Sequence, residues 1–311
     1  MLIVLYKILD RIRGRRIKLI MYSFFGDFAN IYMRVKYLIK YFIRNKKRET
    51  FDNDSNIIVS LTTFPARIEM VYLTICSLLD QTVKPKKLIL WLADTQFQSI
   101  DTLPRRLLRL VNYGLEIRFC DDLRSHKKYY YTCKEYPEYT IITVDDDIFY
   151  PPNLIQKLVE KSKSYPTCVC CNRGHEITFC DKRVDKYNKW KKEATYLNIP
   201  SAELCPTGVG GILYPPGCFY YDFLNKDKII ECAIMADDLW LKVMELMQGT
   251  KAVYTDGFPQ WLFTIRGTQK DTLSQTNVHR NNNDIVMEHL EKTYNINIYE
   301  LCHCEKTIHM L

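Results

Sequence analysis

The chain has 311 residues, of which 47% are hydrophobic and 26% are charged, and its formal net charge is +8. This length can bury a sizeable core in one large domain or two ordinary ones, and the composition is normal for a soluble globular protein. No apolar run is as long as a membrane span, which argues against a transmembrane helix.

The 12 cysteines do not form a recognisable framework. Several lie in apolar runs, where they are expected to be small reduced hydrophobic residues. The clusters at 168–171 and 302–304 lack the paired CxxC spacing of a structural zinc site. The first ten residues place their positive charges after the apolar stretch and are followed by no small-residue cleavage site. We therefore expect a cytoplasmic protein that can also attach peripherally to the inner face of the cytoplasmic membrane.

Residues 1–50 interleave aliphatic and aromatic residues with Lys and Arg, and we treat them as a separate segment. On a helix, one face would carry Val35, Leu38, Ile39 and Phe42, and another would carry Lys36, Lys40 and Arg44. A basic amphipathic helix of this kind can lie on an anionic membrane surface. The alternative is a helix packed on the main domain with a solvated basic face.

From residue 57 to 171 the pattern alternates between strands and helices. The predicted strands cover 57–64, 86–94, 115–120, 140–146 and 167–171. The predicted helices cover 67–83, 103–114 and 151–166. This alternation indicates βαβ units, and hence an α/β, Rossmann-like fold with a mostly parallel sheet flanked by helices. In such sheets ligands bind beyond the carboxyl ends of the strands.

The second half of the chain is less regular. Residues 205–219 are dense in glycine, but they do not open a helix as a phosphate-binding GxGxxG motif would. Residues 235–248 predict a helix with Asp237 and Asp238 in its first turn, where acids also suit the helix dipole. Residues 251–259 predict a further strand and turn.

The sequence VDDDIFYPP places three consecutive acids, Asp145 to Asp147, at the end of the predicted fourth strand. Neighbouring carboxylates repel one another, and their burial is costly without a positive partner. In a DxD spacing, Asp145 and Asp147 can point to the same side of a turn. Carboxylate oxygens are the ligands that Mg²⁺ and Mn²⁺ prefer, so these two residues predict a metal site. Nearby, Lys127 and Lys128 could balance the charge of a diphosphate, or belong to a solvated basic loop.

Five stretches in this order resemble the bacterial glycosyltransferases of the GT-A fold: VSLTTFPAR, a second strand ending in Asp94, VDDDIFYPP, TGVGGILYPPG and ADDLW. The resemblance covers residues 56–285, between the basic segment 1–50 and a C-terminal helical tail at 286–311. It implies an enzyme of surface-glycan synthesis, of the capsule and lipopolysaccharide type.

The resemblance also implies roles for individual residues. Those against the nucleotide would be Thr62, Thr63, Arg67 and Asp94. Asp145 would approach the ribose and, with Asp147, the metal, while Asp146 would help with either. Gly210 and Gly211, in TGVGG, would line the donor-sugar and acceptor pocket. Asp238 or Asp237 would be the catalytic base, and His279 would be a further metal ligand unless it is a surface histidine.

The expected function is therefore transfer of a hexose from a nucleotide-diphosphate sugar to a glycan or glycolipid, with Mn²⁺ or Mg²⁺ as cofactor and with inversion at the anomeric carbon. One alternative is a phosphohydrolase of the haloacid-dehalogenase kind, although its DxD would normally follow the first strand. Another is a non-catalytic basic protein that binds membrane or nucleic acid. Because no nucleic-acid-binding module is recognisable, we expect no nucleic-acid partner.

Overall fold

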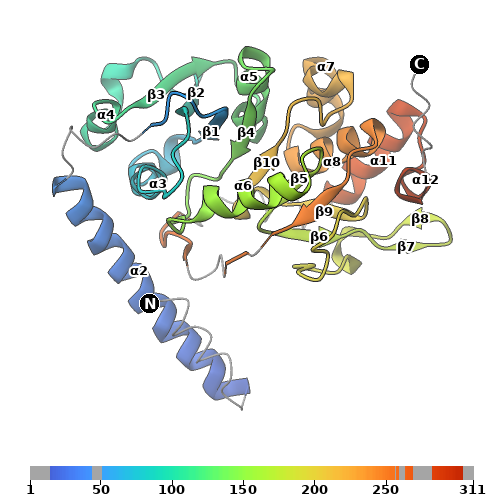
Figure 1. Ribbon diagram of the computed structural model, residues 1–311, viewed down its shortest axis with the longest axis horizontal. Helices are drawn as coiled ribbons and strands as arrows, with labels where there is room; N and C mark the ends of the chain where they lie inside the picture. Colours follow the sequence, from blue (N-terminus) through green and yellow to red (C-terminus); the bar gives the residue numbers. More distant parts are fainter. Residues whose placement is uncertain (1–14, 44–50, 256, 259–262, 269–281, 304–311) are drawn as a thin grey trace.

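The computed structural model describes residues 15–43, 51–255, 257–258, 263–268 and 282–303, with the side chains of 15–20 and 23 excepted. A sheet of seven strands forms the centre of the molecule, in the order β11-β5-β10-β4-β1-β2-β3 (Figure 1). These strands are β1 (Ile57–Thr62), β2 (Lys87–Ala93), β3 (Leu115–Cys120), β4 (Thr140–Thr143), β5 (Val169–Cys171), β10 (Ile212–Tyr214) and β11 (Ala252–Tyr254).

The sheet is mostly parallel, as predicted. β1 pairs in parallel with β2 and β4, β2 with β3, and β5 with β11. Only β10 runs the other way, between β4 and β5. The prediction of an α/β fold with a mostly parallel sheet flanked by helices is thus confirmed.

Two apolar cores cover the two faces of the sheet, because successive residues of a strand point to opposite sides. Val59 and Leu61 of β1 belong to one core and Ile58 belongs to the other. The first core is closed by α3 (Val71–Leu78), α4 (Arg105–Val111) and α6 (Leu154–Ser164). The second is closed by α5 (Lys127–Glu135), α8 (Asp237–Gln248) and α11 (Asn282–Tyr294).

Smaller elements lie between β5 and β10 and near the C-terminus. β6 (Gly174–Glu176) pairs with β9 (Leu204–Pro206), and β7 (Phe179–Cys180) pairs with β8 (Arg183–Val184). The short helix α7 (Lys226–Lys228) continues into a π-helix over Ile229–Ala233. Helix α12 (Ile298–His303) contacts α8. The predicted boundary at residue 285 falls inside α11, which itself packs against α8.

The N-terminal segment forms one long helix, α2 (Arg15–Ile43), which runs along the α/β body with its first turns pointing away from it (Figure 1). Ala29, Met33, Tyr37 and Tyr41, spaced by four residues, are buried in the first core. None of the described helices is both long and apolar enough to cross a membrane.

Several predicted elements are shorter in the structure. β4, predicted to reach residue 146, ends at Thr143, before the three aspartates. β3, in contrast, has the predicted limits. The predicted helix over 67–83 shrinks to α3, after a 3₁₀ turn at Pro65–Arg67.

Candidate active site

The acidic residues singled out in the sequence gather at the edge of the sheet where β1, β2 and β4 end. Asp145–Asp147 follow β4 directly. Because β10 is antiparallel to β4, with Ile212 paired to Thr143, the glycine-rich loop before β10 arrives at the same edge. The first turn of α8, with Asp237 and Asp238, contacts this loop. Three segments that are far apart in the sequence therefore meet at the position expected for a ligand site.

Asp146 and Asp147 are buried and face the guanidinium group of Arg67. The Arg67 Nη1 atom lies 2.6 Å from Asp146 Oδ1 and 3.1 Å from Asp147 Oδ2. Asp146 also accepts a hydrogen bond of 2.5 Å from the Thr63 hydroxyl. Burial raises the pKa of Asp146, although Arg67 and Thr63 act in the opposite direction. Thr63, Arg67 and Asp146 thus form a connected polar group beneath the edge.

Lys128 connects the DxD loop to α8. Its ammonium group lies 3.0 Å from Asp145 Oδ1 and 2.9 Å from Asp237 Oδ2, and only 6% of its side chain is exposed. Burial alone would lower the pKa of Lys128, but Asp145, Asp237 and Asp238 raise it well above its usual value. Lys128 is therefore a buried, charged residue in the acidic cluster, and not part of a solvated basic loop.

Asp238 has the electrostatic environment of a general base. Burial, followed by the neighbouring charge of Asp237, raises its pKa to about 7. In contrast, Lys128 and His126 outweigh burial at Asp237 and lower its pKa. Asp238 is also only partly buried, whereas Asp237 is buried. Two adjacent carboxyl groups whose pKa values are pushed apart are typical of acid–base sites, and here Asp238 is the member suited to accept a proton near neutral pH.

Gly208 lies at the centre of this cluster, and its role was not predicted. Its backbone N–H donates to both carboxylate oxygens of Asp238, at 3.2 Å each. A methyl group in place of its hydrogen would come within 2.6 Å of Lys128 Nζ and 3.1 Å of Asp145 Oδ1. The sequence pointed to the TGVGG loop, but spacing alone could not show which glycine would approach the acids.

The two predicted glycines, Gly210 and Gly211, are closely packed on the chain around them. A side chain at Gly210 would collide with the backbone of Arg173, at 2.8 Å. Gly211 has a φ of +82°, which favours glycine, and it packs on Leu154. Tyr150, which was not predicted, connects the two loops: its hydroxyl accepts from the Asp145 N–H at 2.9 Å and donates to the Val209 carbonyl at 3.2 Å.

The other predicted residues occupy the neighbouring part of the edge. Thr62 donates its hydroxyl hydrogen to the Trp91 carbonyl at 2.9 Å. Asp94 is exposed, directly after β2. Lys127 is buried, and its ammonium group donates to Asp122 at 2.5 Å, so its charge is already paired within the structure. His279 lies outside the described residues.

The described residues supply only part of the ligands that a divalent cation would need. Among the residues that the structure describes, no three His, Cys, Asp or Glu side chains are grouped so as to hold a metal ion. Asp145 is the most accessible acid of the triplet, with 31% of its side chain exposed, whereas Asp147 faces Arg67. Asp145 and Asp147 offer the carboxylate oxygens that Mg²⁺ or Mn²⁺ prefers, but an ion would have to share these carboxylates with Lys128 and Arg67.

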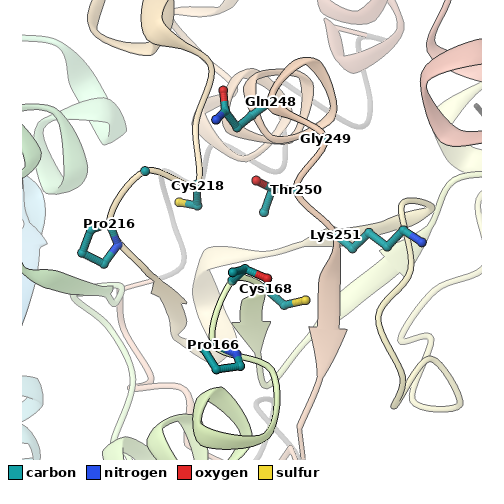
Figure 2. A pocket seen from close by; sticks show the side chains of 10 residues that line it. Pro166, Cys168, Pro216, Cys218, Gln248, Gly249, Thr250 and Lys251 are labelled. Carbon is teal, nitrogen blue, oxygen red and sulfur yellow. The ribbon is translucent and has the colours of Figure 1, made fainter. Parts of the chain in front are cut away.

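A separate hollow of about 380 Å³ lies at the opposite edge of the sheet (Figure 2). It is formed by the turns before β5 and after β10 and by the C-terminal end of α8. Among the described residues that line it, Lys251 alone is charged, and Figure 2 shows this side chain extending away from the others. This hollow contains none of the predicted site residues.

Comparison with known proteins gives matches to solved structures only. No family model matches the chain, and no curated protein matches it. TarS residues 1–349 from S. aureus share 13% identity over 64% of this chain and 56% of that one, with a TM-score of 0.39. CMP:2-keto-3-deoxy-manno-octonic acid synthetase, complexed with CTP, shares 11% identity over 66% of this chain and 92% of that one, with a TM-score of 0.36. The chain thus spans little more than half of the TarS fragment, and neither likeness bears on the chemistry of the site.

Proposed function

We propose that the protein is a GT-A-type glycosyltransferase that moves a sugar, expected to be a hexose, from a nucleotide-diphosphate donor to a hydroxyl group of a glycan or glycolipid. The observation that carries the proposal is Asp238: a partly exposed carboxyl with a pKa of about 7, beside Asp145 and Lys128 at the ligand-binding edge of a mostly parallel sheet. The order of motifs in the sequence supports the same function.

In this proposal Asp238 is the general base. It accepts the proton of the acceptor hydroxyl while the oxygen attacks the anomeric carbon, and the bond from that carbon to the diphosphate breaks. General bases work best when their pKa lies near the working pH. The Gly208 N–H holds the Asp238 carboxylate in place, and burial, followed by the charge of Asp237, raises the pKa of Asp238. Direct attack of this kind inverts the anomeric centre.

The departing diphosphate gathers negative charge that the site must stabilise. Lys128 is the cation in the cluster, and its high pKa keeps it charged throughout the neutral range. Arg67 holds Asp146 and Asp147 in place through its guanidinium group. We propose that Asp145 and Asp147, with His279, hold Mn²⁺ or Mg²⁺, which when bound would offset charge on the two phosphates.

The nucleotide would lie along the ends of β1 and β2. Thr62 and Asp94 mark these ends, and the exposed carboxylate of Asp94 could accept hydrogen bonds from the base. Thr63 and Arg67 would act indirectly, because both are bonded to Asp146. The acceptor would approach over the 207–211 loop, and we propose a role in bacterial surface-polysaccharide synthesis.

A thermal-shift screen tests the function. UDP, GDP, CDP and their sugars would be added to the full chain with and without Mn²⁺, and stabilising donors would then be assayed for transfer and for hydrolysis. We expect one nucleotide class to raise the Tm, more so with Mn²⁺, and Asp238→Asn to bind this nucleotide but not turn it over. If no nucleotide stabilises the protein, and a generic phosphate ester is hydrolysed in a manner that Asp145→Asn abolishes, the phosphohydrolase replaces the proposal.

A further inference from the structure

The outer face of α2 is apolar along its whole described length. Between residues 21 and 43, every exposed position whose side chain is described carries a large hydrophobic residue. These positions are Phe24, Phe28, Ile31, Tyr32, Val35, Ile39, Phe42 and Ile43. They recur every three or four residues, so they form one stripe along the helix. Phe24, Ile31, Phe42 and Ile43 are each more than 60% exposed.

This arrangement agrees with the predicted apolar face at three of its four residues and departs from it at Leu38, which packs against the first core. The predicted apolar face, with Val35, Ile39 and Phe42, points outward, while a different set of residues packs on the domain. Lys36 and Lys40 are half-buried at the flank, where Lys40 pairs with Asp80 and Lys36 lies over the ring of Tyr37. A contiguous apolar face of this extent marks an interaction surface.

The surroundings of the stripe are positively charged. Helix α2 contains six basic residues and one acid, Asp27, which pairs with Arg266. At the C-terminal end of the stripe, Arg109 lies over the rings of Tyr41 and Phe42, and Arg105 and Arg106 are exposed on the same helix, α4. A surface with an apolar centre and a basic border is complementary to an anionic lipid bilayer, in which apolar side chains enter the headgroup boundary and cations meet the phosphates.

Helix α2 is also bonded to the segment that supports the acidic triplet. The Asn30 side chain donates to the Thr264 carbonyl at 2.6 Å, and Arg34 donates to the Arg266 carbonyl. In the same segment, the Ile265 N–H donates to the Asp147 carbonyl at 2.7 Å. The orientation of α2 is therefore fixed relative to the acidic edge by direct contacts and one intervening segment.

We propose that the outer stripe of α2 docks on an anionic phospholipid surface and thereby holds the acidic edge at a fixed orientation to the bilayer. A second copy of the chain is the other occupant that an apolar helix face could accept. Pairing two such stripes would bring the basic borders of both copies together, and like charges in contact are unfavourable. The charge of the border thus selects lipid over a second copy, and the proposal does not depend on the enzymatic function.

Vesicle flotation with the full chain tests this. The variant is Ile31→Gln/Ile39→Gln, at positions 63% and 53% exposed, and the matched control is Ile199→Gln/Ile230→Gln, at positions 64% and 49% exposed. Glutamine has a good helix propensity, and substitutions at exposed positions do not disturb the core. On vesicles of equal parts phosphatidylglycerol and phosphatidylcholine, we expect at least tenfold weaker binding for the α2 variant and unchanged binding for the control. Binding of the wild-type chain should weaken on pure phosphatidylcholine and in 0.5 M NaCl.

Circular dichroism and Tm verify that both variants are folded, and light scattering gives the mass without lipid. Equal vesicle binding by the α2 variant and the wild type would overturn the proposal, as would the absence of wild-type binding. A dimer that dissociates in the α2 variant but not in the control would assign the stripe to a second copy instead.

Discussion

Asp145 and Asp237 share the ammonium group of Lys128, at 3.0 and 2.9 Å, although one follows β4 and the other begins α8. One buried cation thus joins two acids on separate elements. Asp238, the next residue along, is left with excess negative charge around it. Burial raises the pKa of both aspartates; at Asp237 the charges of Lys128 and His126 outweigh burial, whereas at Asp238 the charge of Asp237 adds to it.

Asp238→Asn should abolish turnover and stabilise the fold. Loss of a general base costs about 10²–10⁴-fold in kcat. Because the pKa of Asp238 is raised in the folded state, its ionisation lowers the free energy of unfolding as the pH rises from about 4 to about 7. Above pH 7 this group causes no further loss of stability. Removing the carboxylate should therefore add about 1–2 kcal/mol at pH 8, allowing for solvent at this partly exposed group. Single-turnover kinetics and Tm at pH 5 and 8 measure both effects. A destabilised Asp238→Asn at pH 8 would contradict the electrostatic assignment.

Asp237→Asn should have the opposite effect on stability. It removes a buried partner of Lys128 and leaves that ammonium with Asp145 alone, a change that typically costs about 3–5 kcal/mol. The pKa of Asp237 is lowered in the fold, so its contribution is present at neutral pH and is lost as the pH falls into the acid range. Urea unfolding at pH 7 and pH 3 should show a difference from wild type that shrinks at pH 3. If Asp237→Asn left the free energy of unfolding at pH 7 unchanged, the ion pair with Lys128 would contribute nothing to stability.

The pH dependence of kcat/KM should report Asp238. Since the carboxylate must be ionised to accept a proton, kcat/KM should rise tenfold per pH unit below about 7 and level off above it. In Asp237→Asn the midpoint should move to lower pH, because the neighbouring negative charge that helps to raise the pKa is gone. An acid limb at the same pH in both proteins would assign the titration to another group.

Gly208→Ala should disturb the site without removing a charged group. The added carbon would lie within 2.6 Å of Lys128 Nζ, and this atom cannot move without lengthening an ion pair. We expect kcat to fall about 10²-fold, since small displacements of catalytic groups are costly. Gly217→Ala is the control: nothing lies within 4 Å of its new carbon, and its φ of +74° imposes a backbone penalty that Gly208 does not carry, so the control is if anything the more strained of the two backbones. Equal activity loss in both variants would point to general destabilisation.

The metal proposal predicts different effects for substitutions at Asp145 and at Asp147. Asp145→Asn should abolish the Mn²⁺-dependent part of nucleotide stabilisation and lower the Tm of the free protein less than Asp237→Asn does, because the Asp145 side chain is 31% exposed and that of Asp237 only 9%. Asp147→Ala should lower the Tm of the free protein as well, because the carboxylate is buried against Arg67. Calorimetric Mn²⁺ titration and thermal shift measure these effects. Full turnover in the presence of EDTA would mean that Lys128 and Arg67 supply the positive charge by themselves.

The strands of the first half could be predicted because each is a compact apolar run bounded by turn residues, as at Leu115–Cys120. β10 escaped prediction, because three residues between glycines and prolines carry no periodic signal. α5 was not among the predicted helices, because its two opening lysines look solvated until the acids that pair with them are known. Likewise, the position of the aspartates at the sheet edge follows from the sequence, but the partners Arg67, Lys128 and Gly208 come from segments that only the tertiary fold brings together.

The backbone contact from Ile265 to Asp147 has a consequence for biosynthesis. β1 to β4 are complete once residue 143 has left the ribosome, yet the support beneath the aspartates arrives more than a hundred residues later. A nascent chain that ends before α8 and the 263–268 segment would lack Asp237, Asp238 and the contact to Asp147, so the acidic cluster is completed only after these segments are synthesised.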